Sequence, residues 1–141
     1  EPEAKLDWNQ RALAMARESA DERAQKWIGS LLNNIGWVHF ESGRYQQAMR
    51  AFEEELRWLE PRGDRRKIVI ARYSIGRVLR AQGKLAEALA LQRELHESLT
   101  ASGNEDPYVV EEIAENLHAL GEAREARAFF AQAHAELDKD V

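Results

Sequence analysis

Apolar residues recur at three- and four-residue intervals along nearly the whole chain, which is the period of an α-helix. The stretch from Trp27 shows the rhythm clearly, with apolar residues at positions 28, 31, 32, 35 and 38. Glycine- or proline-containing breaks interrupt the pattern at 43, 61–63, 83, 102–104 and 121. No segment alternates as a strand does, so the pattern predicts an all-α protein of about seven helices.

A short sequence phrase, Gly-x-x-x-x-Ala, recurs at the break between successive helical stretches. Its members are Gly43-x-Tyr45-x-x-Ala48, Gly83-x-Leu85-x-x-Ala88 and Gly121-x-Ala123-x-x-Ala126, so the glycines lie 40 and 38 residues apart. Glycine lets the chain reverse in a few residues, and alanine lets two helix axes approach closely. A period of this length is typical of repeat proteins, whose neighbouring units share one core and which usually work through their surfaces.

The breaks divide the 141 residues into one domain, 1–141, made of repeated helix pairs. We expect an unpaired helix at 4–20 and repeats at 22–61, 62–101 and 105–138. Within the unpaired helix, Trp8, Ala12, Met15 and Ala16 are predicted to face inward. The first three of these lie 40 residues before second-helix positions of the first repeat, so this helix corresponds to the second half of a preceding unit. The chain is therefore expected to be a piece of a longer array, or its cap, without its native N-terminus.

These motifs resemble the tetratricopeptide repeat family, over roughly residues 29–137. The first unit reads Ile35-Gly36-x-x-His39, then Gly43-x-Tyr45-x-x-Ala48 and Phe52, and the second and third units follow with weaker matches. The 38–40-residue spacing is similar to the longer-unit subclass seen in kinesin light chains and bacterial peptide-sensing regulators. His39, Leu79 and Leu117 replace the family tyrosine of the first helix. The resemblance implies a right-handed superhelix, or solenoid, of antiparallel helix hairpins. It also implies a concave groove, lined by first helices, that holds an extended peptide or a partner helix.

The helical phase predicts which side chains face that groove. The candidate partner-binding residues are Asn33, Asn34, Trp37 and Glu41 in the first unit, Tyr73, Arg77 and Arg80 in the second, and Glu111, Glu115 and His118 in the third. Trp37 on a polar helix face is either an aromatic packed against a neighbouring helix or an exposed anchor for a partner. The asparagines could bond a peptide backbone, and Arg77 could pair with a ligand carboxylate. Such a groove is basic and aromatic in the middle and acidic at one end.

Composition reduces the range of partners and chemistry that we expect for this chain. The net charge of −5 argues against nucleic acid as a partner, and no run approaches the roughly 20 apolar residues of a membrane span. Without cysteine there is no disulfide or thiolate metal site. His118 shares a helix face with Glu115 and Glu122, but one histidine is a weak metal site. We expect no catalysis and no cofactor, and a cytoplasmic location.

The prediction is therefore a non-catalytic scaffold that binds a protein or peptide in its groove. One alternative is a self-assembly module that forms a homo-oligomer through the ends of the array. The unpaired first helix favours it, as does the pair Phe129 and Phe130, because adjacent helical residues point about 100° apart and one ring is expected to face outward. A second alternative is a peptide-responsive regulatory domain of a larger protein.

Overall fold

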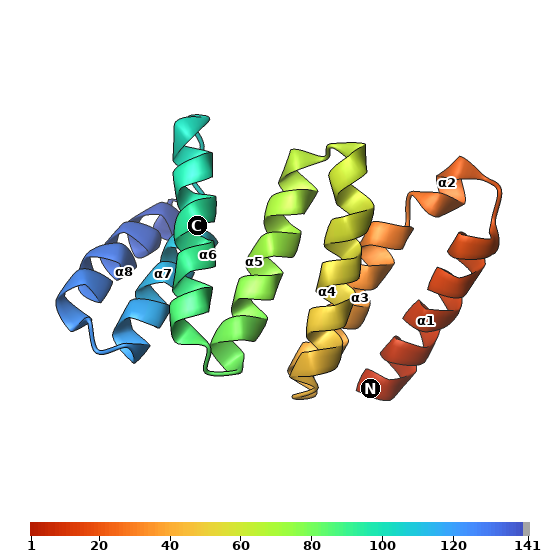
Figure 1. Ribbon diagram of the computed structural model, residues 1–141, viewed down its shortest axis with the longest axis horizontal. Coiled ribbons are helices and arrows are strands. Elements are labelled where there is room, and N and C mark those ends of the chain that lie inside the picture. The colour runs from red at the N-terminus through yellow and green to blue at the C-terminus, as the bar shows by residue number, and fades with distance from the viewer. Residues whose placement is uncertain (140–141) are drawn as a thin grey trace. The chain divides into compact units, whose positions relative to one another are not determined.

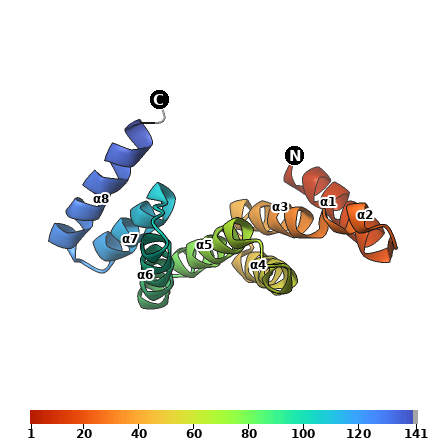
Figure 2. The ribbon, with the colours of Figure 1, turned by 90° about the horizontal axis from the view of Figure 1, so that it is seen from above.

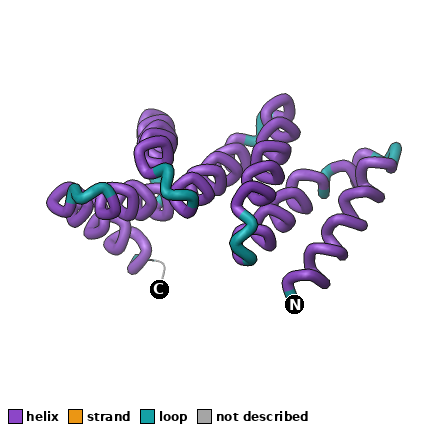
Figure 3. Tube along the Cα trace, turned by 60° about the horizontal axis from the view of Figure 1, so that its bottom comes forward, coloured by secondary structure: helices purple, strands orange, loops and turns teal. Residues whose placement is uncertain are grey.

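Helices joined by short turns make up the computed structural model, which describes residues 1–139, and Figure 3 shows them in purple with the turns in teal. No strand occurs among the described residues, so the all-α prediction is confirmed. The helices are α1 (Pro2–Glu18), α2 (Glu22–Gln25), α3 (Ile28–Glu41), α4 (Tyr45–Leu59), α5 (Arg65–Ala81), α6 (Leu85–Ala101), α7 (Pro107–Ala119) and α8 (Ala123–Asp138), with a 3₁₀ turn, η1, at Glu60–Arg62. Seven of these described helices are long, as predicted, whereas the single turn α2 and η1 were not predicted.

Two compact units divide the chain, and the boundary falls inside α5. The first unit is 1–78 and the second begins at 79, so each has its own core. In the first unit α1 packs on α3, and α3 packs on α4. In the second unit α6 packs on α7, and α7 packs on α8.

The hairpin α3–α4 closes at Gly43, which adopts a left-handed conformation with φ of 75°. Beside it, the backbone N–H of Arg44 donates to the carbonyl of His39 at 2.8 Å, so this carbonyl in the last turn of α3 is satisfied. The two helices run side by side in opposite directions (Figure 1). They approach tightly at Gly36, where an added Cβ would lie only 2.3 Å from the ring of Phe52. Glycine at this position therefore makes room for a fully buried phenylalanine on α4.

Helix α1 lies against α3 (Figure 2) through Leu6, Leu13 and Ala16, which join the apolar core of the first unit. The buried amide of Asn9 adds a polar contact, because its Oδ1 accepts a hydrogen bond from Nδ2 of Asn34 on α3 at 3.2 Å. This arrangement fixes which side of α1 faces the core.

The predicted orientation of α1 was partly wrong. Ala16 is buried and Ala12 is half-buried, but Trp8 and Met15 are exposed. The prediction was based on the matching positions of later second helices. Those positions pack against the first helix of their own repeat. Helix α1 instead buries the side that faces α3, the next long helix.

The hairpin α7–α8 begins and turns at the predicted residues. The carboxylate of Asp106 caps α7 by accepting from the N–H of Tyr108 at 2.9 Å, and Gly121 closes the turn with φ of 88°. Phe129 and Phe130 both pack, half-buried, against the core of this hairpin. The expectation that one ring faces outward was therefore wrong. Helical phase alone missed this because each ring rests against a different neighbour, His96 or His118.

Candidate partner-binding surface

Trp37 lies on the middle of α3 and is half-buried. Its ring makes edge contacts with Phe40 and with Phe52, each at 5.2 Å between ring centroids. Such contacts are favourable for aromatic pairs and hold the indole in place. Trp37 is therefore a packed aromatic whose remaining exposed part is fixed, and Phe40 is a neighbour that the sequence argument did not include.

Arg77 projects from α5 onto the same aromatic group. Its guanidinium carbon lies 5.6 Å from the centre of the Trp37 ring and 5.3 Å from that of Phe40. One of its N–H groups donates to the hydroxyl of Tyr73 at 3.2 Å, one turn earlier on the helix. Cation–π attraction and this hydrogen bond hold the charge in a defined position. The structure thus brings together Trp37, Tyr73 and Arg77, three of the residues that the sequence grouped.

The two asparagines of α3 point to opposite neighbours. Nδ2 of Asn33 donates to Oε1 of Glu55 on α4 at 3.3 Å, while Asn34 bonds Asn9 on α1. The two amides therefore link α3 to α4 and to α1. Glu41 is exposed at the end of α3.

Glu55 is the unusual ionisable group of the first unit, because its side chain is buried on α4. Burial raises the pKa of Glu55 from 4.5 to about 7, and the hydrogen bond from Asn33 and the positive charge of Lys67 oppose that rise. At neutral pH the carboxyl is therefore divided between its protonated and ionised forms. Asn33 was predicted to lie on the binding surface, whereas no role was predicted for its partner Glu55.

His39, which replaces a family tyrosine, is half-buried at the end of α3. Its Nδ1 accepts a hydrogen bond from Nε of Arg44 at 3.0 Å. Burial, and then the nearby charge of Arg44, lower the pKa of His39, while Glu3 opposes the shift. The imidazole therefore favours its neutral form, and its hydrogen bond with Arg44 links the end of α3 to the turn.

In the second unit, Arg80 forms a two-pronged ion pair with Glu112 on α7. Nε and Nη2 of the arginine each lie 2.9 Å from a carboxylate oxygen, and the glutamate side chain is only 4% exposed. Such paired geometry is the strong form of this interaction. Arg80, predicted to meet a ligand, is thus engaged with a buried carboxylate, a contact that helical phase could not reveal.

The acidic end of the predicted surface lies on α7. Glu111 and Glu115 are half-buried, and His118 is exposed. The His118 ring lies 6.5 Å from that of Phe130 on α8. Within the part of the chain that the structure describes, no group of three or more histidine and carboxylate side chains could hold a metal ion.

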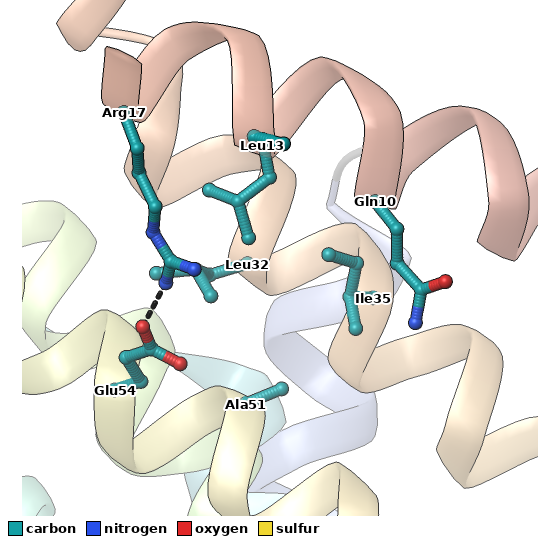
Figure 4. Close-up of a pocket in the computed structure, with 8 residues that line it drawn as sticks. Gln10, Leu13, Arg17, Leu32, Ile35, Ala51 and Glu54 are labelled. Atoms are coloured by element: carbon teal, nitrogen blue, oxygen red, sulfur yellow. Dashed lines mark hydrogen bonds and ion pairs between the residues drawn. The ribbon is translucent and has the colours of Figure 1, made fainter.

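A pocket of about 290 Å³ lies among α1, α3 and α4 and was not predicted (Figure 4). Leu13, Leu32, Ile35 and Ala51 form its apolar lining, and Gln10 lies at one end. The ion pair between Arg17 and Glu54 spans the other end. Helices from different repeats contribute the lining residues, so no single helical stripe in the sequence marks this pocket.

Antiparallel helix hairpins closed by turn glycines, with small residues at the helix contacts, define a helical repeat protein. A family model described as tetratricopeptide repeat matches residues 27–101, which is just over half of the chain. The chain therefore belongs to the tetratricopeptide repeat family. The match spans α3 to α6, and the α7–α8 hairpin lies beyond it. A search of curated proteins gave no match.

Repeats of this family generally mediate protein–protein interactions, so the partners of this chain are expected among proteins. None of the described helices is long and apolar enough to span a bilayer.

Proposed function

We propose that the chain is a non-catalytic scaffold that binds an extended peptide or a partner helix through the surface of α3 and α5. Its central residues are Trp37, Tyr73 and Arg77. The observation that carries the proposal is the fixed position of the Arg77 guanidinium against two aromatic rings. A cation held in this way loses little conformational freedom when a ligand binds, which favours affinity.

The chemistry of these residues indicates the kind of ligand. Arg77 offers a planar cation that can pair with a carboxylate, and the partly exposed Trp37 offers apolar area for a neighbouring side chain. The peptide is therefore one that carries an acidic residue next to an apolar one. Family membership supports a protein partner in general terms, and the peptide and its binding residues are our proposal.

The second unit carries the acidic residues of the predicted surface, Glu111 and Glu115, together with His118. We propose that they contribute contacts to basic positions of a partner. Both glutamates are half-buried, so part of each remains accessible to a partner, which supports this role.

Peptide display on the intact chain tests the proposal, with an Arg77→Met variant as the main comparison. Methionine retains an apolar stem against the rings of Trp37 and Phe40 but removes the charge. We expect the selected peptides to be enriched in acidic residues and to bind Arg77→Met at least about tenfold more weakly, as for the loss of one charge-assisted contact.

Arg93→Met is the matched control. Arg93 also lies over an aromatic ring, that of Phe129, but it belongs to the second unit and lies outside the proposed surface. Circular dichroism verifies that both variants keep their helices. Unchanged affinity of the selected peptides for Arg77→Met would show that the proposed surface is wrong.

A further inference from the structure

Helix α5 carries positive charge along its length and contains no acidic residue, although the net charge of the chain is −5. Its cationic residues are Arg65, Arg66, Lys67, Arg72, Arg77 and Arg80. Carboxylates from outside the helix pair with three of them, Lys67, Arg72 and Arg80. The side chain of Arg66 is exposed, and within the part of the chain that the structure describes it takes part in no ion pair or hydrogen bond.

Arg66 lies on the same side of α5 as the residues of the proposed peptide surface. Positions 66, 70, 73 and 77 are spaced by four, three and four residues, so they fall within about 60° around the helix. Ile70, between Arg66 and Tyr73, is a large apolar side chain that is 42% exposed. The stripe therefore runs from an exposed cation, past Ile70 and Tyr73, to the Arg77 that lies over the ring of Trp37.

The needs of the helix do not explain this stripe. Arg66 lies in the first turn of α5, where a positive charge opposes the helix dipole. Asp64 already caps that end, because its carboxylate accepts from the backbone N–H of Lys67 at 3.2 Å. A single exposed apolar residue is common in proteins, but Ile70 continues a surface that already holds aromatic rings. A cation and an apolar side chain thus extend the peptide surface along α5.

We propose that the peptide surface continues along α5 to Arg66, and that its ligand is an extended peptide with two acidic residues about five positions apart and an apolar residue between them. This inference rests on the proposed function, because it takes Arg77 as the contact of one acidic residue. The other acidic residue meets Arg66, and the apolar residue meets Ile70. The absence of acidic side chains from α5 favours such a ligand, because no carboxylate of this helix repels it.

The spacing follows from helix and strand geometry. Eleven residues of helix lead from Arg66 to Arg77, which is a rise of about 16 Å. An extended peptide covers that distance in about five residues. A helical ligand lying along α5 would instead need about eleven residues between its acidic positions. The separation of the two acidic residues therefore identifies the conformation of the ligand.

A series of synthetic peptides tests this ligand on the intact chain. Each peptide carries two glutamates with a leucine between them in a serine background, and the glutamate spacing varies from about two to about eleven positions. Fluorescence anisotropy of a labelled peptide measures each dissociation constant. We expect the tightest binding at a spacing of about five, because an extended chain of that length reaches both arginines. Tightest binding at about eleven, or no dependence on spacing, overturns the extended ligand.

Arg66→Met should weaken binding of the best-spaced peptide at least about tenfold, through the loss of one charge-assisted contact. Arg65→Met is the matched control. Arg65 is an exposed cation in the same turn but lies about 100° away around the helix, so its loss should change the affinity less than about twofold. Two further peptides each have one glutamate replaced by glutamine. One should respond only to Arg66→Met and the other only to Arg77→Met.

Ile70→Ser tests the apolar contact and should weaken binding at least about threefold, because the leucine of the peptide loses its apolar neighbour. Leu120→Ser is the control, because Leu120 is also 42% exposed but lies at the end of α7 in the second unit. Its affinity for the peptide should be unchanged. Circular dichroism verifies that the variants keep their helices.

The results separate this inference from the proposed function. If Arg77→Met weakens binding while Arg66→Met has no effect, the peptide surface ends before Arg66 and the inference is wrong, although the proposed function stands. Equal losses for Arg66→Met and Arg65→Met also overturn it, because they would indicate general attraction to a positive helix. If neither Arg66→Met nor Arg77→Met weakens binding, the proposed function fails and this inference fails with it.

Discussion

The hairpins α3–α4 and α7–α8 have the same construction, but three pairs of matched positions show how their packing differs. The two turn glycines, Gly43 and Gly121, are 78 residues apart, and this offset aligns the hairpins. The matched pairs are Gly36 with Ala114, Phe52 with Phe130, and Glu55 with Ala133. Phe52 is fully buried while Phe130 is half-buried, and a buried carboxyl in one hairpin stands where the other has a buried methyl.

Gly36 leaves room for the Phe52 ring at the contact between α3 and α4. A Cβ at position 36 would lie 2.3 Å from the Phe52 ring, a distance that packed atoms do not adopt. Glycine removes this obstacle, and Phe52 fills the space. Ala114 carries the methyl group in the other hairpin, and Phe130 stays closer to the surface. The first hairpin is thus more tightly packed at its aromatic position.

Truncating the two phenylalanines should give the largest difference between the hairpins. Phe52→Ala should lower the free energy of unfolding by about 3–5 kcal/mol, because it leaves a cavity in a fully buried site. Phe130→Ala should cost about half as much, since part of that ring already meets water. Urea denaturation measures both values. Equal losses would contradict the link between ring depth and Gly36.

A methyl group at the helix contact should give a smaller effect. Gly36→Ala should destabilise the protein by about 1–3 kcal/mol through overpacking against Phe52, although alanine is the better helix former. Gly29→Ala is the control, because its Cβ would lie 3.4 Å from Leu59, an ordinary contact. That variant should be neutral or slightly more stable in the same measurement. If Phe52→Leu also rescues Gly36→Ala, the clash with the ring is its cause.

The buried carboxyl should make the first hairpin sensitive to pH. Because the pKa of Glu55 rises from 4.5 in the unfolded chain to about 7 in the fold, the folded protein holds a proton that the unfolded chain has lost between these values. Stability should therefore fall as pH rises from about 4.5 to about 7, by at most about 3 kcal/mol. Glu55→Gln should remove this contribution and be more stable than the unaltered chain at about pH 8, but not at about pH 4.

Denaturant midpoints measured across this pH range provide the test. Glu53→Gln is the control, because Glu53 is exposed on the same helix and should leave the pH dependence unchanged. The prediction is contradicted if Glu55→Gln keeps the pH dependence of the unaltered chain.

Local sequence determined much of this fold. The apolar period and the turn glycines located the helices and their ends, because both act within a few residues of the chain. The orientation of α1 could not be derived in this way. Trp8 and Met15 occupy positions that are covered in later repeats, and only the packing of α1 on α3 shows that another side is buried.

The candidate surface was also predicted only in part, because local patterns do not show how neighbouring helices pack. Helical phase grouped Trp37, Tyr73 and Arg77, and the structure brings their side chains together. Phase could not show that Asn33 reaches a buried carboxyl on α4, or that Arg80 is paired with Glu112. Those contacts join residues 22 and 32 positions apart, and they depend on how neighbouring helices lie.

The packing of each helix on its neighbours in sequence has a kinetic consequence. Contacts such as α3 with α4 and α7 with α8 close only short loops, so little chain entropy is lost before they stabilise the fold. The hairpins should therefore form early and rapidly, without waiting for distant parts of the chain. By the same reasoning the protein can open one hairpin at a time, and amide protons should exchange in blocks that correspond to helix pairs.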